Sequence, residues 1–222
     1  MHFEVKEYTE NISKIIPGYK SIYEMTFAYL SSNIKSNAEI LVVGSGGGAE
    51  IQYMANIHND WHITGIDPSQ EMCNNAQSVV DSLELSARVE IVNGYVSNLP
   101  REKYFSAATS ILVMHLLEDN GAKFEYLSNI LYRLESGAPF ILVDFCGDRT
   151  APLFFNQIAA WKRNAQNRGV TPEMMQKQER VILEELPFVT ENREIALLNA
   201  VGFSKITSFY QSFMYKGWIA HK

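Results

Sequence analysis

Glycines and one carboxylate stand in this chain where they could hold a nucleoside. Residues 44–48, Gly-Ser-Gly-Gly-Gly, follow the apolar run 39–43 and open a helical segment. Glycines let the chain turn tightly there and let backbone atoms approach a ligand without a Cβ in the way. Asp67 ends the next apolar run, 23 positions after Gly44, where a carboxylate can accept both hydroxyls of an adenosine ribose. The spacing therefore predicts a nucleoside-binding site.

A purely structural use of the same residues is the alternative. The glycines would then form only a strand-to-helix turn, and Asp67 would only cap the following helix. Ser69 is itself a suitable N-cap residue, so Asp67 is not needed for capping. Strand, glycine-rich loop, helix, strand and terminal Asp in this order favour the binding interpretation.

The elements that would position these residues follow from the hydrophobic pattern. Short apolar, β-branched runs alternate with helical segments, which predicts an α/β fold with a parallel sheet and helices on both faces. The predicted strands are 39–43, 61–66, 88–92, 105–110 and 140–145, and the predicted helices between them are 48–57, 69–83 and 122–134.

The carboxyl-terminal part of the chain departs from this alternation. Residues 172–201 are predicted to be largely helical, with a break around Pro187. Ser204–Tyr210 and Phe213–His221 then form two strands separated by only a few residues. Such a connection requires an antiparallel hairpin, because a parallel one needs a crossover of a dozen residues or more.

Composition disfavours several classes of protein. The 19 Lys and Arg residues against 25 Asp and Glu residues give a net charge of -6, whereas binding through phosphate neutralisation favours a basic excess. No stretch approaches the roughly 18 unbroken apolar residues of a membrane span, and the first residues lack a signal-peptide pattern. Cys73 and Cys146 show no CxxC or His partner pattern, so we expect no disulfide framework and no metal site. A cytoplasmic location fits these thiols.

A nicotinamide-dependent oxidoreductase is a competing hypothesis. Gly44, Gly46 and Ala49 formally satisfy the dinucleotide pattern G-x-G-x-x-G/A. Against it, Asp67 is followed by Pro-Ser-Gln-Glu-Met at 68–72, the chain ends in the antiparallel hairpin, and no second mononucleotide-binding half follows.

The order of these motifs resembles that of the class I S-adenosylmethionine-dependent methyltransferases. Their pattern of strand, G-x-G-x-G and Asp-Pro-Ser-x-x-Met is found here at 44–48 and 67–72, and the resemblance covers nearly the whole chain. It implies S-adenosylmethionine as the cofactor. It also implies a Rossmann-like seven-stranded, mostly parallel sheet with an antiparallel last strand, helices on both faces and an N-terminal helical lid. We expect a single domain over 1–222, with a helical cap at 1–38 and the core at 39–222.

The resemblance also implies roles for individual residues. Those expected to touch the cofactor are Tyr19, Gly44, Ser45, Gly46, Gly48, Asp67, Pro68, Met72, Tyr95, Val96, Ser110 and Ile111. The glycine loop would wrap the methionine and ribose parts, and Asp67 would hold the ribose. Pro68 and Met72 would flank the adenine. Ser110 and Ile111 would lie beneath the sulfonium.

Residues 89–100 resemble the family's segment after the third strand, with one difference. Tyr95 stands where the family usually has an Asp that binds the adenine amine. Stacking of Tyr95 on the adenine and simple covering of it both stay open.

Within that class, the nearest resemblance is to the carboxy-S-adenosylmethionine synthases of tRNA wobble-uridine modification. The segment 16–19, Ile-Pro-Gly-Tyr, matches a motif whose Tyr contacts the cofactor, and the tail segments 200–203 and 209–213 are also similar. This similarity makes carboxy-S-adenosylmethionine synthesis the alternative function.

Two positions depart from that closer family. Its members pair an Arg with the extra carboxylate of their cofactor, but an ungapped match here places Glu179 there and Arg180 one residue later. One helical step turns a side chain by about 100°, and an inward Glu179 would repel a carboxylate. Ile111 replaces the family's Asn at the end of the fourth strand. We therefore favour ordinary in-line methyl transfer to a small molecule.

Two residues are candidates for catalysis. Methyl transfer depends mainly on alignment and on exclusion of water, and it needs a base only when the nucleophile arrives protonated. His115 follows the fourth strand and could act as that base, with a packing role as the alternative. Asp144 ends the fifth strand, where it could take part, bind a cationic acceptor or cap the next segment.

The remaining expectations concern the acceptor and other partners. Tyr8, Tyr19 and Trp161 could line a lid over the site, with the core as the alternative. The apolar stretch Phe154–Trp161 indicates a small organic acceptor. Neither nucleic acid nor a membrane is an expected partner, and formation of a homodimer stays open. The intact glycines disfavour a non-enzymatic interaction module.

Overall fold

One mixed sheet organises the chain, of which the computed structural model describes residues 11–222. Its strand order is β3-β2-β1-β4-β5-β7-β6. The strands are β1 (Glu39–Val43), β2 (His62–Asp67), β3 (Val89–Asn93), β4 (Ala107–Ile111), β5 (Pro139–Phe145), β6 (Ser204–Ser212) and β7 (Tyr215–His221). The first five strands run parallel, and β7 pairs antiparallel with both β5 and β6. The predicted sheet with its antiparallel hairpin is confirmed.

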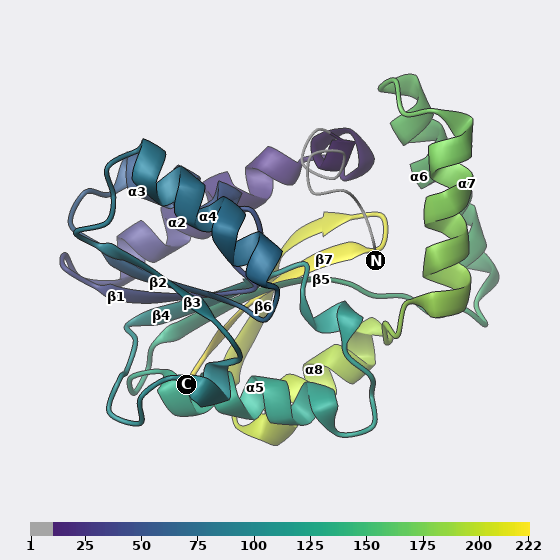
Figure 1. Cartoon of the computed structure of the whole chain (residues 1–222). Coiled ribbons are helices and arrows are strands. Elements are labelled where there is room, and N and C mark those ends of the chain that lie inside the picture. The colour runs from purple at the N-terminus through teal and green to yellow at the C-terminus, as the bar shows by residue number, and fades with distance from the viewer. Residues whose placement is uncertain (1–10) are drawn as a thin grey trace.

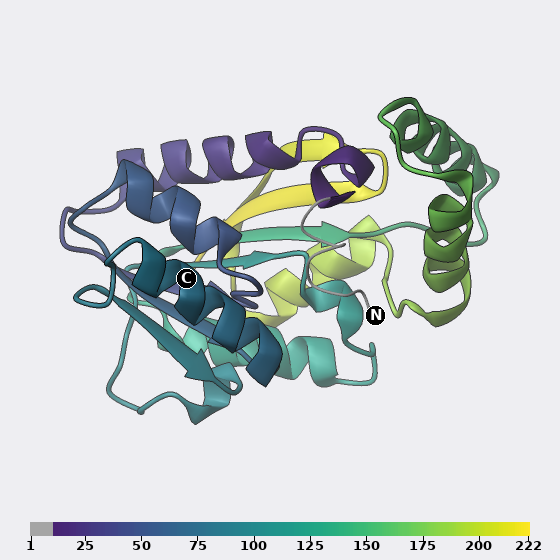
Figure 2. The same cartoon turned by 45° about the horizontal axis from the view of Figure 1, so that its top comes forward.

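Helices cover both faces of the sheet, as predicted. They are α2 (Tyr19–Asn33), α3 (Ala49–Ile57), α4 (Gln70–Ser82), α5 (Ala122–Arg133), α6 (Pro152–Asn167), α7 (Pro172–Arg180) and α8 (Glu191–Val201). In Figures 1 and 2, α2, α3 and α4 lie on one face, while α5 and α8 lie on the other. Two separate apolar clusters fill the two layers. The pair α6 and α7 stands beyond the sheet, on the right of Figure 1.

The central strand β1 is apolar from Ile40 to Val43 because it is buried on both faces there. Ile40, Leu41 and Val42 expose none of their surface, and Val43 exposes 4%. In a parallel sheet the crossover helices cover both sides, so strands become continuous hydrophobic runs instead of alternating ones. This burial is the physical reason that residues 39–43 could be recognised from sequence.

Side-chain N-caps begin three of the described helices, α4, α7 and α8. The side chain of Ser69 accepts a hydrogen bond from Met72 N at the start of α4, so the predicted N-cap is confirmed. The side chain of Thr190 accepts one from Arg193 N at the start of α8. Between α7 and α8 the chain forms one π-helical turn and then runs without helix around Pro187, which confirms the predicted break.

The N-terminal segment forms part of the layered structure. Ile22 and Leu30 of α2 are fully buried and Phe27 nearly so, because α2 lies across the sheet and packs on β5 and α3. Contacts with the hairpin lie near both ends of α2: the Tyr210 hydroxyl donates to Pro17 O just before the helix at 2.6 Å, and the Tyr29 hydroxyl is hydrogen-bonded to His221 Nε2 at 3.1 Å. The predicted helical cap therefore covers a face of the sheet along most of its length.

Two of the three candidate lid residues are Tyr8 and Trp161. Tyr8 lies outside the described residues. Trp161 exposes 1% of its surface, and its Nε1 donates to Ile15 O at 2.8 Å, joining α6 to the helical residues 11–15. Trp161 is thus a core residue, which was the alternative to a lid.

The glycine at the end of β1 is required by its neighbour as well as by its backbone angle. Gly44 has φ of +75°, and a Cβ built on it would lie 2.3 Å from Cγ2 of Val113. Val113 belongs to the connection between β4 and α5. The glycine-rich loop and this connection therefore pack directly against each other.

We expect Gly44→Ala to lower the free energy of unfolding by about 2–4 kcal/mol, measured by urea denaturation, since an unfavourable φ and an overlap add. Gly137→Ala is the matched control. Gly137 has φ of +76° but nothing within 4 Å of a built Cβ, so it should lose only about 1–2 kcal/mol. Adding Val113→Ala to Gly44→Ala should restore part of the loss. Equal destabilisation by the two glycine variants would contradict the packing argument.

Candidate functional site

The strand order reverses between β1 and β4, and in open α/β sheets this is where ligands bind. The loop after β1 lies over this point because its first two amides are fixed to the neighbouring strand. Gly44 N and Ser45 N both donate to Ile66 O, at 2.8 and 3.1 Å. The chain direction and these bonds bring the glycines and the end of β2 together at one edge.

Asp67 joins the two motifs that the sequence singled out. Its Oδ2 accepts the Gly46 amide at 3.0 Å, and its Oδ1 accepts the Ser69 amide at 2.9 Å. The residue exposes 9% of its surface. A carboxylate has about four acceptor positions, so two remain for hydroxyls of a ligand. The sequence-predicted pairing of glycine loop and carboxylate is present in the fold.

The middle of the loop leaves bare backbone for a ligand. Gly46 has φ of +49°, and a Cβ built on it would meet only Gly44 O, at 3.9 Å. Gly48, in contrast, is buried, and its built Cβ would lie 3.0 Å from Cα of Ala76 in α4. Open backbone at Gly46 beside an acceptor carboxylate fits the adenosyl ligand that the motif implies.

Other predicted cofactor residues surround this point with different exposure. Pro68 is exposed, Met72 is half-buried, and Tyr95, which follows β3, exposes 64% of its surface. Val96 is buried. Ser45 is buried as well, and its Oγ has no partner among the described residues. Exposed Tyr95 presents an aromatic face on which a base could stack.

The residues at the end of β4 present little side chain to this edge. Ser110 is fully buried and its Oγ is hydrogen-bonded to the Tyr126 hydroxyl at 2.6 Å. Ile111 exposes 8% and packs in the cluster on the opposite face. Tyr19 lies on that same face, with its hydroxyl 2.5 Å from that of Tyr23. Burial raises the pKa of Tyr19.

The two candidate catalytic residues are in direct contact. Asp144 is fully buried, and its Oδ1 accepts both the backbone amide and the Nδ1 hydrogen of His115. His115 exposes 6% of its surface. Donation from Nδ1 leaves Nε2 as the basic nitrogen, the arrangement in which a buried carboxylate orients a general base. Asp144 itself is closed off from solvent.

A second buried carboxyl lies behind this pair. Glu194 of α8 is fully buried, and neither of its oxygens receives a hydrogen bond from a described donor group. Burial, and next the charge of Asp144, raises the pKa of Glu194 well above its usual value. A protonated Glu194 can donate to Asp144 Oδ2, which otherwise lacks a donor among the described residues. The order of contacts is Glu194, Asp144, His115.

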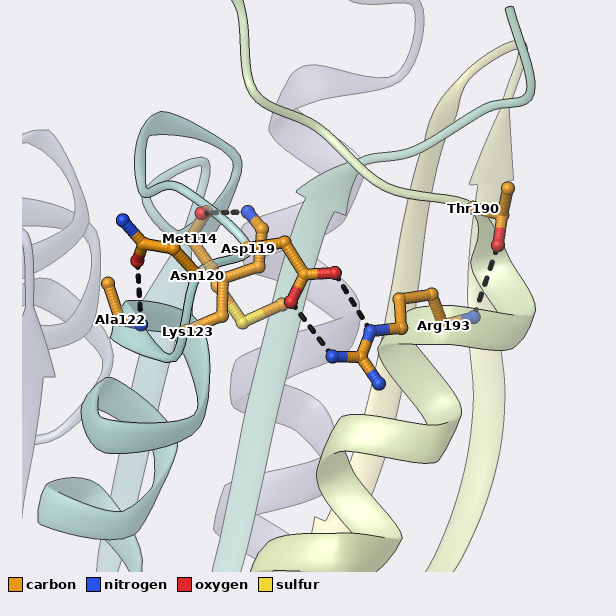
Figure 3. Close-up of polar contacts among 7 residues, drawn as sticks. All are labelled: Met114, Asp119, Asn120, Ala122, Lys123, Thr190 and Arg193. Atoms are coloured by element: carbon orange, nitrogen blue, oxygen red, sulfur yellow. Dashed lines mark hydrogen bonds and ion pairs between the residues drawn. The ribbon is translucent and has the colours of Figure 1, made fainter. Parts of the chain in front are cut away.

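The connection that carries His115 is fastened at three points. Besides the Asp144 contacts, Lys123 Nζ donates to Met114 O at 2.7 Å, and Arg193 of α8 binds both oxygens of Asp119 at 2.9 and 3.0 Å. Figure 3 shows the last two links side by side, with Arg193 reaching from α8 to the loop. Such bidentate pairs hold a defined geometry. The imidazole is thus set on a rigid loop.

Sequence reasoning missed three buried charged residues near this edge. They are Glu50 in α3, Lys123 in α5 and Glu194 in α8. A signal existed, since each lies on the apolar face of its helix. Glu194, for example, precedes buried Leu197 and Leu198 by three and four positions, which places all three on one helix face. A charge within an apolar helical stripe was the available clue.

Residues 11–222 contain neither a helix suited to cross a membrane nor a cluster of metal-ligating side chains. No helix in this range is long and apolar enough to cross a membrane. Nor do these residues contain three or more His, Cys, Asp or Glu side chains grouped so as to hold a metal ion.

Comparison with known proteins gives a consistent set of similarities. A family model described as a methyltransferase domain matches residues 40–137. The carboxy-S-adenosyl-L-methionine synthase of Dichelobacter nodosus is 23% identical over 220 residues, covering 97% of this chain and 88% of that relative. A SAM dependent methyltransferase from Aquifex aeolicus has the same fold, with a TM-score of 0.63, 16% identity and 99% coverage of both chains. A candidate O-methyltransferase from Nostoc punctiforme PCC 73102 gives a TM-score of 0.68 at 13% identity, and this chain spans 60% of its length.

Because the pKa of Glu194, the carboxyl behind Asp144, is raised, we expect the stability difference between the wild type and Glu194→Gln to depend on pH. Folded Glu194 keeps its proton, while in the unfolded chain it ionises near pH 4.3. Folding therefore binds a proton above that pH, and this contribution to stability falls as pH rises. Since the pKa of folded Glu194 is raised, we expect the free energy of unfolding of the wild type to fall relative to Glu194→Gln as the pH rises above about 4.3, by up to ~1.4 kcal/mol per pH unit until folded Glu194 ionises.

Glu194→Gln suits this test because its amide can still donate to Asp144. Glu125→Gln, at an exposed position of α5, is the control and should leave the slope unchanged. Denaturant unfolding at several pH values gives both curves. A difference between wild type and Glu194→Gln that is constant with pH would contradict a protonated Glu194.

Proposed function

The chain belongs to the class I S-adenosylmethionine-dependent methyltransferases, and from this premise we propose that it methylates a small-molecule acceptor with His115 as general base. S-adenosylmethionine is the cofactor of this family. When bound, it supplies a methyl group on a positively charged sulfur, already equipped with its leaving group. The chain itself must bind the cofactor, position the acceptor and accept the acceptor's proton.

We assign cofactor binding to the edge formed by β1 and β2. Asp67 would accept the ribose hydroxyls with the acceptor positions that Gly46 and Ser69 leave free. The bare backbone at Gly46 would let the ligand approach closely. The exposed ring of Tyr95 would cover the base by stacking.

We assign acceptance of the acceptor's proton to Nε2 of His115, and one observation supports this assignment. The Asp144 carboxylate is hydrogen-bonded to Nδ1 of this imidazole, which fixes the tautomer and leaves the free lone pair on Nε2. The proton of an acceptor hydroxyl or amine would pass to Nε2 as the new bond to the methyl carbon forms. Buried Asp144 then stabilises the resulting imidazolium.

The nature of the acceptor is inferred from charge and surface. The net charge of -6 disfavours a nucleic-acid acceptor. Leu153 and Phe155 of α6, in the segment after β5, expose 66% and 48% of their surface, which suits a small apolar acceptor. Both cysteines are free and buried, and a cytoplasmic location agrees with that state.

Carboxy-S-adenosylmethionine synthesis is the second candidate, because a curated enzyme of that name is similar over 97% of the chain. The position where a carboxylate-binding Arg is expected holds Glu179. Its carboxylate forms an ion pair with Lys162 of α6, and the neighbouring Arg180 is exposed. A charge already neutralised by Lys162 offers no attraction to a carboxylated cofactor, so this arrangement favours ordinary methyl transfer.

We expect S-adenosylhomocysteine to bind the wild-type protein in calorimetric titration and Asp67→Ala to weaken that binding at least tenfold. The variant removes charge-assisted hydrogen bonds, each worth roughly 1.5–3 kcal/mol. Asp60→Ala, at the opposite end of β2, is the control and should bind like the wild type. Absence of binding to the wild type would defeat the proposed function.

The same preparation separates the two candidate functions. Mass spectrometry of the small molecule released from purified protein should give S-adenosylmethionine or S-adenosylhomocysteine. A cofactor heavier by one carboxyl group would instead establish the second candidate.

We expect His115→Asn to lower kcat by about 10²–10⁴-fold, the usual contribution of a general base, with unchanged affinity for S-adenosylhomocysteine. The Asn amide can still donate to Asp144 but has no basic nitrogen. Release of S-adenosylhomocysteine with a panel of phenols, carboxylic acids and amines measures the rate. His62→Asn, at the exposed start of β2, is the control. Full activity of His115→Asn on a protonated acceptor would remove His115 from the mechanism.

A further inference from the structure

One buried carboxyl at the ligand edge has no part in the proposed chemistry. Glu50 lies in the first turn of α3, directly after the glycine-rich loop, and exposes 6% of its surface. Its Oε1 accepts the Thr109 hydroxyl at 2.5 Å. Thr109 is the register partner of Val42 across the β1–β4 pair. Glu50 therefore reaches over β1 to β4, between the two strands where the strand order reverses.

No cation among the described residues balances this carboxyl. None of the ion pairs over residues 11–222 includes Glu50. The groups that face it are the Thr109 hydroxyl from β4 and the phenol of Tyr19 from α2, while the phenol of Tyr126 interacts with it from the other layer. All three are uncharged at neutral pH. Burial raises the pKa of Glu50 to about 7.

A buried acid without a cationic partner is costly to keep, because its ionised form has lost its hydration. Packing alone does not require one at this position, since the neighbouring buried residues Ile51, Met54 and Ala55 of α3 are apolar. An acid poised near neutral pH in such surroundings is suited to receive a positive charge from a ligand.

We infer that Glu50 is a binding residue for the α-ammonium group of the amino-acid part of the cofactor. The inference rests on the proposed function, which brings an adenosyl ligand with an amino-acid part to this edge. An ammonium group has three N–H donors, whereas a sulfonium has none, so only the ammonium can donate hydrogen bonds to a carboxylate. The Thr109 hydroxyl holds one carboxyl oxygen and orients the other. Glu50 and His115 then approach the edge from opposite faces of the sheet.

The inference separates two ligands that share the adenosine and sulfur. S-adenosylhomocysteine carries the ammonium group, and 5′-methylthioadenosine lacks the entire amino-acid part. We expect Glu50→Gln to weaken S-adenosylhomocysteine at least tenfold in calorimetric titration at pH 8, as for loss of a charge-assisted hydrogen bond. Binding of 5′-methylthioadenosine should change less than twofold. Gln keeps the size of Glu and can still accept from Thr109.

Proton linkage gives a second readout that needs no enzyme activity. A cationic ligand favours ionised Glu50, so below about pH 7 binding must displace a proton. The affinity of the wild type for S-adenosylhomocysteine should therefore fall between pH 8 and pH 6, and that of Glu50→Gln should not. Affinity for 5′-methylthioadenosine should be independent of pH in both proteins.

Thr109→Val keeps the inference testable should Glu50→Gln fold poorly. The Thr109 hydrogen bond lowers the pKa of Glu50, so its loss should move the fall in S-adenosylhomocysteine affinity to higher pH. Equal weakening of both ligands by Glu50→Gln, or no weakening of either, would overturn the inference and leave Glu50 a structural residue. If the wild type bound neither ligand, the proposed function would fail and the inference with it.

Discussion

The hydrogen bond from the Gly46 amide to the Asp67 carboxylate is the constraint on which the ligand edge depends. It joins the loop after β1 to the end of β2, and the second oxygen of Asp67 holds the start of α4 through Ser69 N. One side chain thereby fixes three elements at the point where the strand order reverses. The backbone of Gly46 is left facing open space, so the proposed binding would need little rearrangement of the protein.

The two layers of the sheet place different acids beside this edge. On the face of α2 and α3, Glu50 is bonded to Thr109 and meets no cation among the described residues. On the face of α5 and α8, Glu194 backs Asp144, which in turn holds His115. Buried ionisable groups are costly, and strongly perturbed pKa values gather at functional sites. Their position at the carboxyl end of the strands agrees with that rule.

Much of the fold followed from local sequence because local physics decides it. Continuous burial made β1 apolar from Ile40 to Val43, and the short link before β7 required a hairpin. Strand bounds were less certain, since they depend on pairing. Phe105 was expected in the fourth strand, but its amide donates to Arg133 O, and the ladder with β1 begins only at Ala107. Local pattern does not carry such long-range partners.

The candidate site also contains residues that local sequence could identify and residues that it could not. Asp67 and the glycines could be found because their spacing along the chain is itself the signal. The pairing of His115 with Asp144 joins the β4–α5 connection to strand β5, and sequence named both residues without revealing the contact. Glu194 and Glu50 were overlooked because their partners come from other elements. The side chains of Ser110 and Ile111 turn to opposite layers, because successive residues of a strand alternate between the two faces of a sheet.

The contact between Gly44 and Val113 has a consequence for how this chain can diversify. The glycine-rich loop packs against Val113, which belongs to the same β4–α5 connection that carries His115. A bulkier side chain at position 113 would clash with the glycine-rich loop. The β4–α5 connection therefore has little freedom to change when the acceptor changes. Variation in acceptor preference has more freedom in α6 and α7, which stand apart from that contact (Figure 1). We therefore expect substitutions that change specificity at the periphery instead of at this contact.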